Sequence, residues 1–168
     1  MDIFMEKIVR KRKDYKDYLI TAAILIGAVA LMVVVMFVPI LGQMWLFFAA
    51  GIIYLAYLLS TTRNIEFEYA VTNGDLDIDK IVAQRKRKRV FSANCKTFEV
   101  VARVKSEHFT PQYKSFKNQI DCTSTKDADG VYFVVLNYKN EQTVVYFEPT
   151  EKMLQSFKTF IPRKVFID

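Results

Sequence analysis

The 168-residue chain contains few of the residues from which metal sites, disulfide scaffolds and phosphate-binding loops are built. It has one histidine, His108, and two cysteines, too few for a zinc site with four ligands. Its five glycines are scattered, so there is no glycine-rich phosphate loop. No Ser, Cys or Asp stands at motif spacing from His108. We therefore expect no metal, no cofactor and no enzymatic activity, and the composition excludes a disulfide miniprotein.

Charged residues are missing from residues 18–62, although they make up 25% of the whole chain. A bilayer core about 30 Å thick needs about 20 apolar residues of helix, so this block can cross twice. Pro39–Gln43 combines a helix breaker, a glycine and an amide, which predicts a turn between spans at about 18–38 and 43–62. A cleaved signal peptide has a shorter apolar region. A soluble helical hairpin would show a polar face, which neither segment has.

Basic residues flank both outer ends of this predicted transmembrane helical hairpin but not the turn between its two spans. Residues 1–17 form a basic N-terminal segment, and Arg63 follows the second predicted span, whereas the turn at 39–43 carries no charge. The positive-inside rule then places both termini in the cytoplasm, as in a multi-pass protein of the cell membrane. In that compartment Cys95 and Cys122 are expected to be free thiols.

Residues 63–168 read as one mostly-β domain that follows the second span with almost no linker. Alternating apolar residues and turn signals predict seven strands, and Asn73-Gly74 marks a tight hairpin. The strands are expected near residues 65–71, 76–81, 86–92, 98–104, 119–124, 131–138 and 143–147. A helix capped by Thr150 follows and ends at Pro162. Its apolar face is predicted to comprise Met153, Leu154, Phe157, Phe160 and Ile161.

Seven antiparallel strands followed by an amphipathic helix fit a bent barrel whose open end is capped by the C-terminal helix. The segment from Glu68 to Ile81, with Arg87-Lys88-Arg89 and Phe98-Glu99-Val100, resembles a family of bacterial proteins. These are uncharacterised two-span membrane proteins of Gram-positive bacteria with a pleckstrin-homology-like (PH-like) cytoplasmic domain. The resemblance implies a binding fold and no known reaction.

The sharpest local feature is the run of five bases from Arg85 to Arg89. On a strand, consecutive side chains point to opposite faces, so the run cannot lie in a core. One interpretation is contact with anionic lipid headgroups, in which Lys80 also takes part. The other is a solvated edge that sets topology; nucleic acid is disfavoured because no aromatic residue interrupts the run. The candidate headgroup-binding residues are Lys80, Arg85, Lys86, Arg87, Lys88 and Arg89.

Two further groups of residues each have two interpretations. The segment 105–119 carries His108, Phe109, Tyr113 and Phe116, which suit either a partner surface or a plug at the mouth of the barrel. Asp75, Asp77 and Asp79 alternate on one strand face. They lack the glycine and distal glutamate of a calcium loop, so a polar strand face is the favoured interpretation.

The sequence thus predicts a non-catalytic, membrane-anchored binding module. Its PH-like domain would contact anionic headgroups, a protein partner, or both, at the inner membrane surface. The net charge of +6 fits a negatively charged partner. The alternative is an accessory subunit of a larger membrane complex, such as a transporter, assembled through the two spans. Transport by the chain alone is disfavoured, because residues 18–62 also lack histidine.

Overall fold

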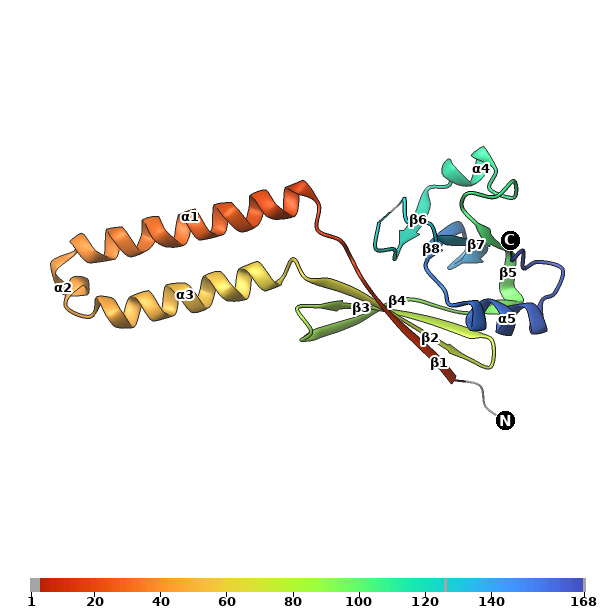
Figure 1. The fold of residues 1–168 in the computed structure, drawn as a ribbon, viewed down its shortest axis with the longest axis horizontal. Helices are drawn as coiled ribbons and strands as arrows, with labels where there is room; N and C mark the ends of the chain where they lie inside the picture. Colours follow the sequence, from red (N-terminus) through yellow and green to blue (C-terminus); the bar gives the residue numbers. More distant parts are fainter. Residues whose placement is uncertain (1–3, 126, 168) are drawn as a thin grey trace. The chain divides into compact units, whose positions relative to one another are not determined.

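A computed structural model describes residues 4–125 and 127–167 (Figure 1). The chain divides into two compact units. The helical unit comprises residues 12–65 together with 82–85, and the β-rich unit comprises the described residues of 4–11, 66–81 and 86–167. The β-rich unit therefore uses residues from before the helices as well as after them.

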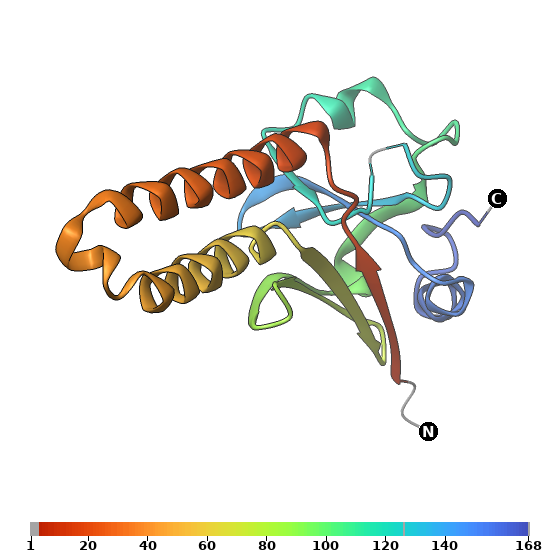
Figure 2. The ribbon, with the colours of Figure 1, turned by 60° about the vertical axis from the view of Figure 1, so that its left-hand side comes forward.

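The helical unit contains α1 (Tyr15–Phe37), the short α2 (Pro39–Gly42) and α3 (Trp45–Thr61). Asp14 caps the start of α1, and its backbone N–H donates to the Asp17 carboxylate at 3.2 Å. Val38 caps the end of the helix, just before Pro39. Both views show α1 and α3 lying side by side and joined through α2 (Figure 2). The predicted break between two helices is confirmed, although part of it is itself helical.

Most apolar side chains of these helices are exposed. Only Val35 on α1 and Ala49 and Ala56 on α3 are buried, whereas Ile26 and Phe37 are 70% and 82% exposed. The helix α1 is long and apolar enough to cross a membrane. The helix α3 has 17 residues, about 26 Å at 1.5 Å per residue, which is shorter than the usual span.

The first sheet has the order β1-β2-β3-β4. Its strands are β1 (Phe4–Arg10), β2 (Ile65–Thr72), β3 (Asp75–Val82) and β4 (Lys86–Asn94). The sequence did not predict β1, which pairs antiparallel with β2 from Phe4↔Thr72 to Arg10↔Glu66. Its pattern is mixed, because Lys7 lies on the same side as Met5 and Val9 while Phe4 is exposed.

The predicted hairpin turn between β2 and β3 is confirmed. Asn73 and Gly74 have φ values of 51° and 89°, the left-handed conformation that this two-residue turn requires. A Cβ at Gly74 would lie 2.9 Å from the Cys95 sulfur and 3.1 Å from the Phe160 ring. Glycine is therefore required here by both conformation and space.

The second sheet has the order β5-β7-β8-β6. Its strands are β5 (Phe98–Arg103), β6 (Asn118–Asp121), β7 (Tyr132–Tyr138) and β8 (Glu141–Phe147), and a short 3-10 helix, η1 (Cys95–Thr97), precedes β5. The prediction of seven antiparallel strands was wrong in two respects. The described residues form eight strands, and β6 runs parallel to β8. Alternation predicts which face of a sheet a side chain occupies, but it does not predict the direction of the neighbouring strand. Here the short helix α4 (Pro111–Lys114) and its loops lie between β5 and β6, and they bring β6 in parallel to β8.

The C-terminal helix α5 (Glu151–Phe160) completes the core of the β-rich unit. The Met153 N–H donates to the Thr150 hydroxyl at 3.3 Å, so the predicted cap is confirmed. Phe157 is fully buried and meets Phe98 edge-to-face, with ring centroids 5.8 Å apart. Phe160, predicted on the same face, is 41% exposed because it lies at the end of the helix beside the Gly74 turn.

Candidate functional site

The five bases from Arg85, just before β4, to Arg89 are all exposed, but they do not form one uniform surface. Arg87 forms an ion pair with Glu68 on β2 and lies 3.8 Å from an Asp79 oxygen on β3. Arg89 forms ion pairs with Asp79 and, at 2.7 Å, with Asp77. The hydrogen bond to Asp79 raises the pKa of Arg89 further above its ordinary value. Two of the five bases are therefore held by carboxylates of the same sheet.

The carboxylates themselves belong to a polar face that extends along the sheet. The Ser92 hydroxyl donates to Asp77 at 2.6 Å, the Asn94 amide donates to Asp75 at 2.7 Å, and Arg10 pairs with Glu66 at 2.8 Å. The interpretation of Asp75, Asp77 and Asp79 as a polar strand face is thus supported. Among the residues that the structure describes, no cluster suited to a metal ion is found.

Regular alternation breaks within β4. Arg87 and Arg89 occupy odd positions and Ser92 occupies an even one, yet all three reach carboxylates of the polar face. The two-residue period must therefore shift between Arg89 and Ser92, which lets Phe91 enter the core with no exposed surface. This shift is what allows one strand to carry both a charged end and a buried end.

The remaining bases of the run have different surroundings. Arg85 donates from Nη2 to the Thr61 hydroxyl at 2.7 Å, at the last residue of α3. Lys86 and Lys88 are exposed and alternate with the paired arginines. Lys80 shares a strand face with the buried Leu76 and Ile78, so it points away from Asp79 and from the two arginines that bind Asp79. The predicted six-residue set is therefore divided among four environments.

The end of the helical hairpin is cross-linked by polar contacts within its own unit. Arg63 donates to one Asp17 oxygen from Nε at 2.9 Å and from Nη2 at 2.6 Å. The Ala83 N–H donates to the Asn64 carbonyl at 2.8 Å. The loop between β3 and β4 is thereby attached to the charged end of the helices, through the same segment that holds Arg85.

The aromatic residues of the loop before β6 pack on the second sheet. Phe109 and Tyr113 lie 4.9 Å and 5.6 Å from the Phe133 ring, centroid to centroid, and Phe116 packs against the same cluster. His108 is exposed and stacks on Phe166 at 3.7 Å. These contacts favour the core-plug interpretation for the three half-buried rings.

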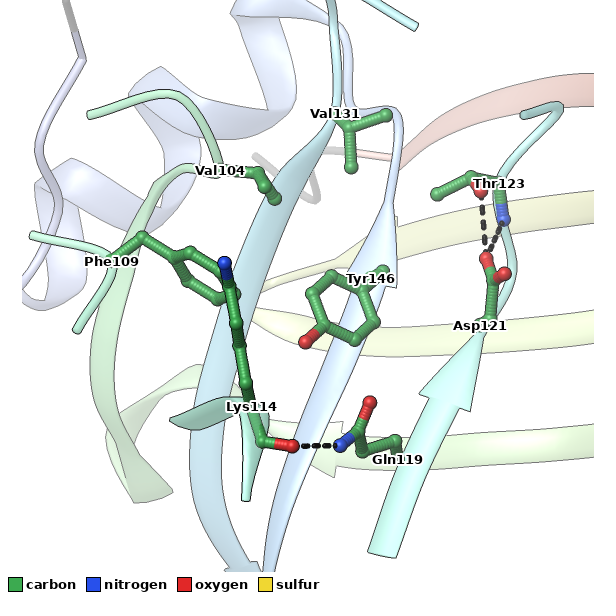
Figure 3. A pocket seen from close by; sticks show the side chains of 8 residues that line it. All are labelled: Val104, Phe109, Lys114, Gln119, Asp121, Thr123, Val131 and Tyr146. Atoms are coloured by element: carbon green, nitrogen blue, oxygen red, sulfur yellow. Dashed lines mark hydrogen bonds between the residues drawn. The ribbon is translucent and has the colours of Figure 1, made fainter. Parts of the chain in front are cut away.

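A pocket of about 410 Å³ lies between this loop and β6 (Figure 3). Its lining combines apolar residues with a polar rim, and Figure 3 shows the Tyr146 hydroxyl pointing toward Lys114 and Gln119. The Gln119 amide donates to the Lys114 and Phe116 carbonyls at 2.7 Å and 3.1 Å. The lining residues are Val104, Phe109, Lys114, Gln119, Asp121, Thr123, Val131 and Tyr146.

The pocket contains a carboxylate, an amine and a tyrosine hydroxyl, which can form polar contacts with a ligand. The Asp121 carboxylate accepts from the Thr123 N–H at 3.0 Å and from the Thr123 hydroxyl at 2.7 Å. Burial, and then the Asp121 charge, raise the pKa of Tyr146, so its hydroxyl stays protonated and able to donate near neutral pH. The Lys114 amine lies 5.6 Å from the centre of the Phe109 ring.

Sequence reasoning missed this pocket except for Phe109. Its residues come from the loop after β5, α4, β6, the loops after β6 and before β7, and β8, and no local spacing connects them. The one available signal was Tyr146, an aromatic hydroxyl within the otherwise apolar run from Val144 to Phe147.

Comparison with known proteins gives one match. A family model described as bacterial PH-like domain (DUF6106) matches residues 1–167. No curated protein and no solved structure matches the chain. The family match includes the residues of β1 and of both long helices, in agreement with the contribution of β1 to the first sheet.

Proposed function

The chain belongs to this family of bacterial PH-like domains, and from that premise we propose that it is a membrane-anchored, non-catalytic binding module. Its β-rich unit would lie at the inner surface of the cell membrane and contact anionic phospholipid headgroups. PH-like folds present a rigid sheet framework on which binding surfaces differ from protein to protein, so the ligand must be argued from side chains.

In this proposal the helical unit is a two-span anchor. The helices α1 and α3 carry no charge between Asp17 and Arg63, and most of their apolar side chains are exposed, as expected of helices that face lipid. Lys11, Arg12 and Lys13 precede α1, so the positive-inside rule puts this end in the cytoplasm. The proposed segments are 1–17, the hairpin 18–62 and the cytoplasmic domain 63–168, with β1 joining that domain from the N-terminal segment.

The observation that carries the lipid proposal is the contact between Arg85 and Thr61. If α3 ends at the headgroups, Arg85 lies at that level, because it is hydrogen-bonded to the last residue of the helix. Lys86 follows directly in the chain, and Lys88 is exposed two residues later. Each base near an anionic surface contributes about 1 kcal/mol. A weak contact suffices, since the anchor keeps its local concentration high.

Native mass spectrometry of the full chain, released from phosphatidylglycerol-containing nanodiscs, tests the proposal. The parent should retain more phosphatidylglycerol than phosphatidylcholine, and the double variant Lys86→Gln with Lys88→Gln should lose most of this preference. The control variant, Lys152→Gln with Lys158→Gln, makes the same charge change at two exposed positions of α5. If the Lys86 and Lys88 variant retains phosphatidylglycerol as the parent does, the lipid contact is refuted.

A second candidate function is that of an accessory subunit, favoured by a groove of about 210 Å³ in the helical unit. It is lined by small and apolar residues of α1 and α3, including Gly27, Ala28 and Ala56. Small residues permit close approach of another helix. Affinity purification from native membranes should then yield one stoichiometric membrane partner, whereas a lipid-binding module would be recovered alone.

A further inference from the structure

The outer edge of β6 has backbone groups available for pairing. In the order β5-β7-β8-β6 this strand is terminal, and among the described strands it pairs only with β8. The Cys122 N–H donates to the Tyr146 carbonyl at 3.0 Å, which fixes the even-numbered residues as those that bond toward β8. In a parallel pair the intervening residues point their N–H and C=O groups the other way. For β6 these residues are Gln119 and Asp121, and both are exposed.

The pocket lies directly beside this edge. Gln119 and Asp121 line its rim, while Val104, Phe109 and Val131 supply apolar surface (Figure 3). An apolar cavity with a few polar groups at its mouth is the usual form of a site that accepts one side chain or a small ligand. Here the cavity and the open strand edge share residues, so one occupant could use both.

The charged side chains at the pocket mouth indicate which kind of group would bind there. Asp121 is already bound by Thr123. The Lys114 amine has no carboxylate within 4.0 Å among residues 4–125 and 127–167, and it lies over the face of the Phe109 ring. The cation is therefore available to an incoming carboxylate.

We propose that the β6 edge and the adjoining pocket dock an extended segment of a partner protein. The segment adds as a strand beside Gln119 and Asp121, places one apolar side chain over Tyr146 in the pocket, and sets an acidic side chain near Lys114. Backbone pairing supplies affinity and the pocket supplies selectivity. None of the bases of the lipid proposal lines this pocket, so the two proposals can be tested with different variants.

A library of random linear 12-residue peptides displayed on phage, selected against the full chain in nanodiscs, provides the probe. The enriched peptides should share an apolar residue next to an acidic one. A synthetic peptide with that pattern should lose affinity at least tenfold for Val104→Trp, which fills the pocket. It should also bind more weakly to Lys114→Gln, and this loss should shrink when the peptide's acidic residue is replaced by its amide.

The backbone pairing has its own matched control. Asp121→Ala and Asp121→Pro both remove the carboxylate, but only proline removes the outward N–H, and proline is tolerated at an open strand edge. The alanine variant should bind within about threefold of the parent, and the proline variant at least tenfold more weakly. The Lys86 and Lys88 double variant should bind the peptide like the parent, which separates this test from the lipid proposal.

Several results would overturn the docking site. One is that no peptide is enriched over empty nanodiscs. Another is that the enriched peptides bind Val104→Trp and Asp121→Pro as tightly as the parent. A third is that Val104→Trp and Lys114→Gln reduce phosphatidylglycerol retention while leaving peptide binding unchanged, which would make the pocket a lipid site instead.

Discussion

Replacing Arg87 and Arg89 with glutamine should destabilise the β-rich unit without weakening its lipid contact. The two arginines are held by Glu68, Asp77 and Asp79 on neighbouring strands. Lys86 and Lys88 lie between and beside them in the chain and have an exposed position. The four bases thus form two pairs that are adjacent in sequence and expected to differ in role.

The magnitude follows from how far each partner is buried. The Glu68 and Asp79 side chains are each 10% exposed, whereas the Arg87 and Arg89 side chains are 57% and 50% exposed. Removing an arginine leaves a mostly buried carboxylate without its charged hydrogen bond, which costs about 1.5–3 kcal/mol before screening. Because water reaches the arginines, about 1–2 kcal/mol each is expected. Both share Asp79, so the double change should cost about 2–3 kcal/mol rather than the full sum.

Pulse proteolysis of the full chain across a urea gradient measures this loss as a lower unfolding midpoint. The matched control is the Lys86 and Lys88 double glutamine variant, whose free energy of unfolding should change by no more than about 0.5 kcal/mol. In phosphatidylglycerol nanodiscs the opposite result is expected. The lysine variant should lose lipid retention, and the arginine variant should keep it. Equal destabilisation by the two variants would refute the division of the basic run.

Two other predictions concern the core of the β-rich unit. Phe157→Ala should lower the free energy of unfolding by about 3–5 kcal/mol in the same assay, because Phe157 is fully buried against Phe98; a loss below about 1 kcal/mol would mean that α5 does not close this core. Burial raises the pKa of Cys122 to about 12, so the thiol favours folding below its unfolded pKa of about 8.5 and this contribution is lost as pH rises toward 12. Cys122→Ala should therefore flatten the decline in stability between about pH 9 and pH 12, and an unchanged alkaline profile would contradict the assignment.

The elements that the sequence predicted well are those with a strong local pattern. The uncharged stretch, the Asn73-Gly74 turn and the helix capped by Thr150 each depend on residues close together in the chain. The strand β1 escaped prediction because Lys7 interrupts its inward side, where its amine reaches the Glu148 carbonyl at 2.8 Å, a partner far along the chain.

The candidate site was predicted only as a set of exposed bases. The pairing of Arg87 with Glu68 depends on which strands become neighbours, and alternation within β4 alone carries no such information. The pocket beside β6 depends on the parallel pairing with β8, which a hairpin-by-hairpin interpretation of the sequence did not include. Local patterns thus revealed which residues are exposed, while tertiary pairing determines which of those residues remain available to a ligand.

The membrane anchor and the cytoplasmic position of the β-rich unit are tested most directly by cysteine accessibility in intact cells. Cys95 and Cys122 are buried, so the parent chain should give little background with a membrane-impermeant thiol reagent. An engineered cysteine replacing exposed Gln43, beside the turn between α1 and α3, should be labelled before lysis. A cysteine replacing exposed Lys139, in the turn between β7 and β8, should be labelled only after lysis. Labelling of the Lys139 position in intact cells, or no labelling at Gln43, would contradict the two-span anchor with both ends in the cytoplasm.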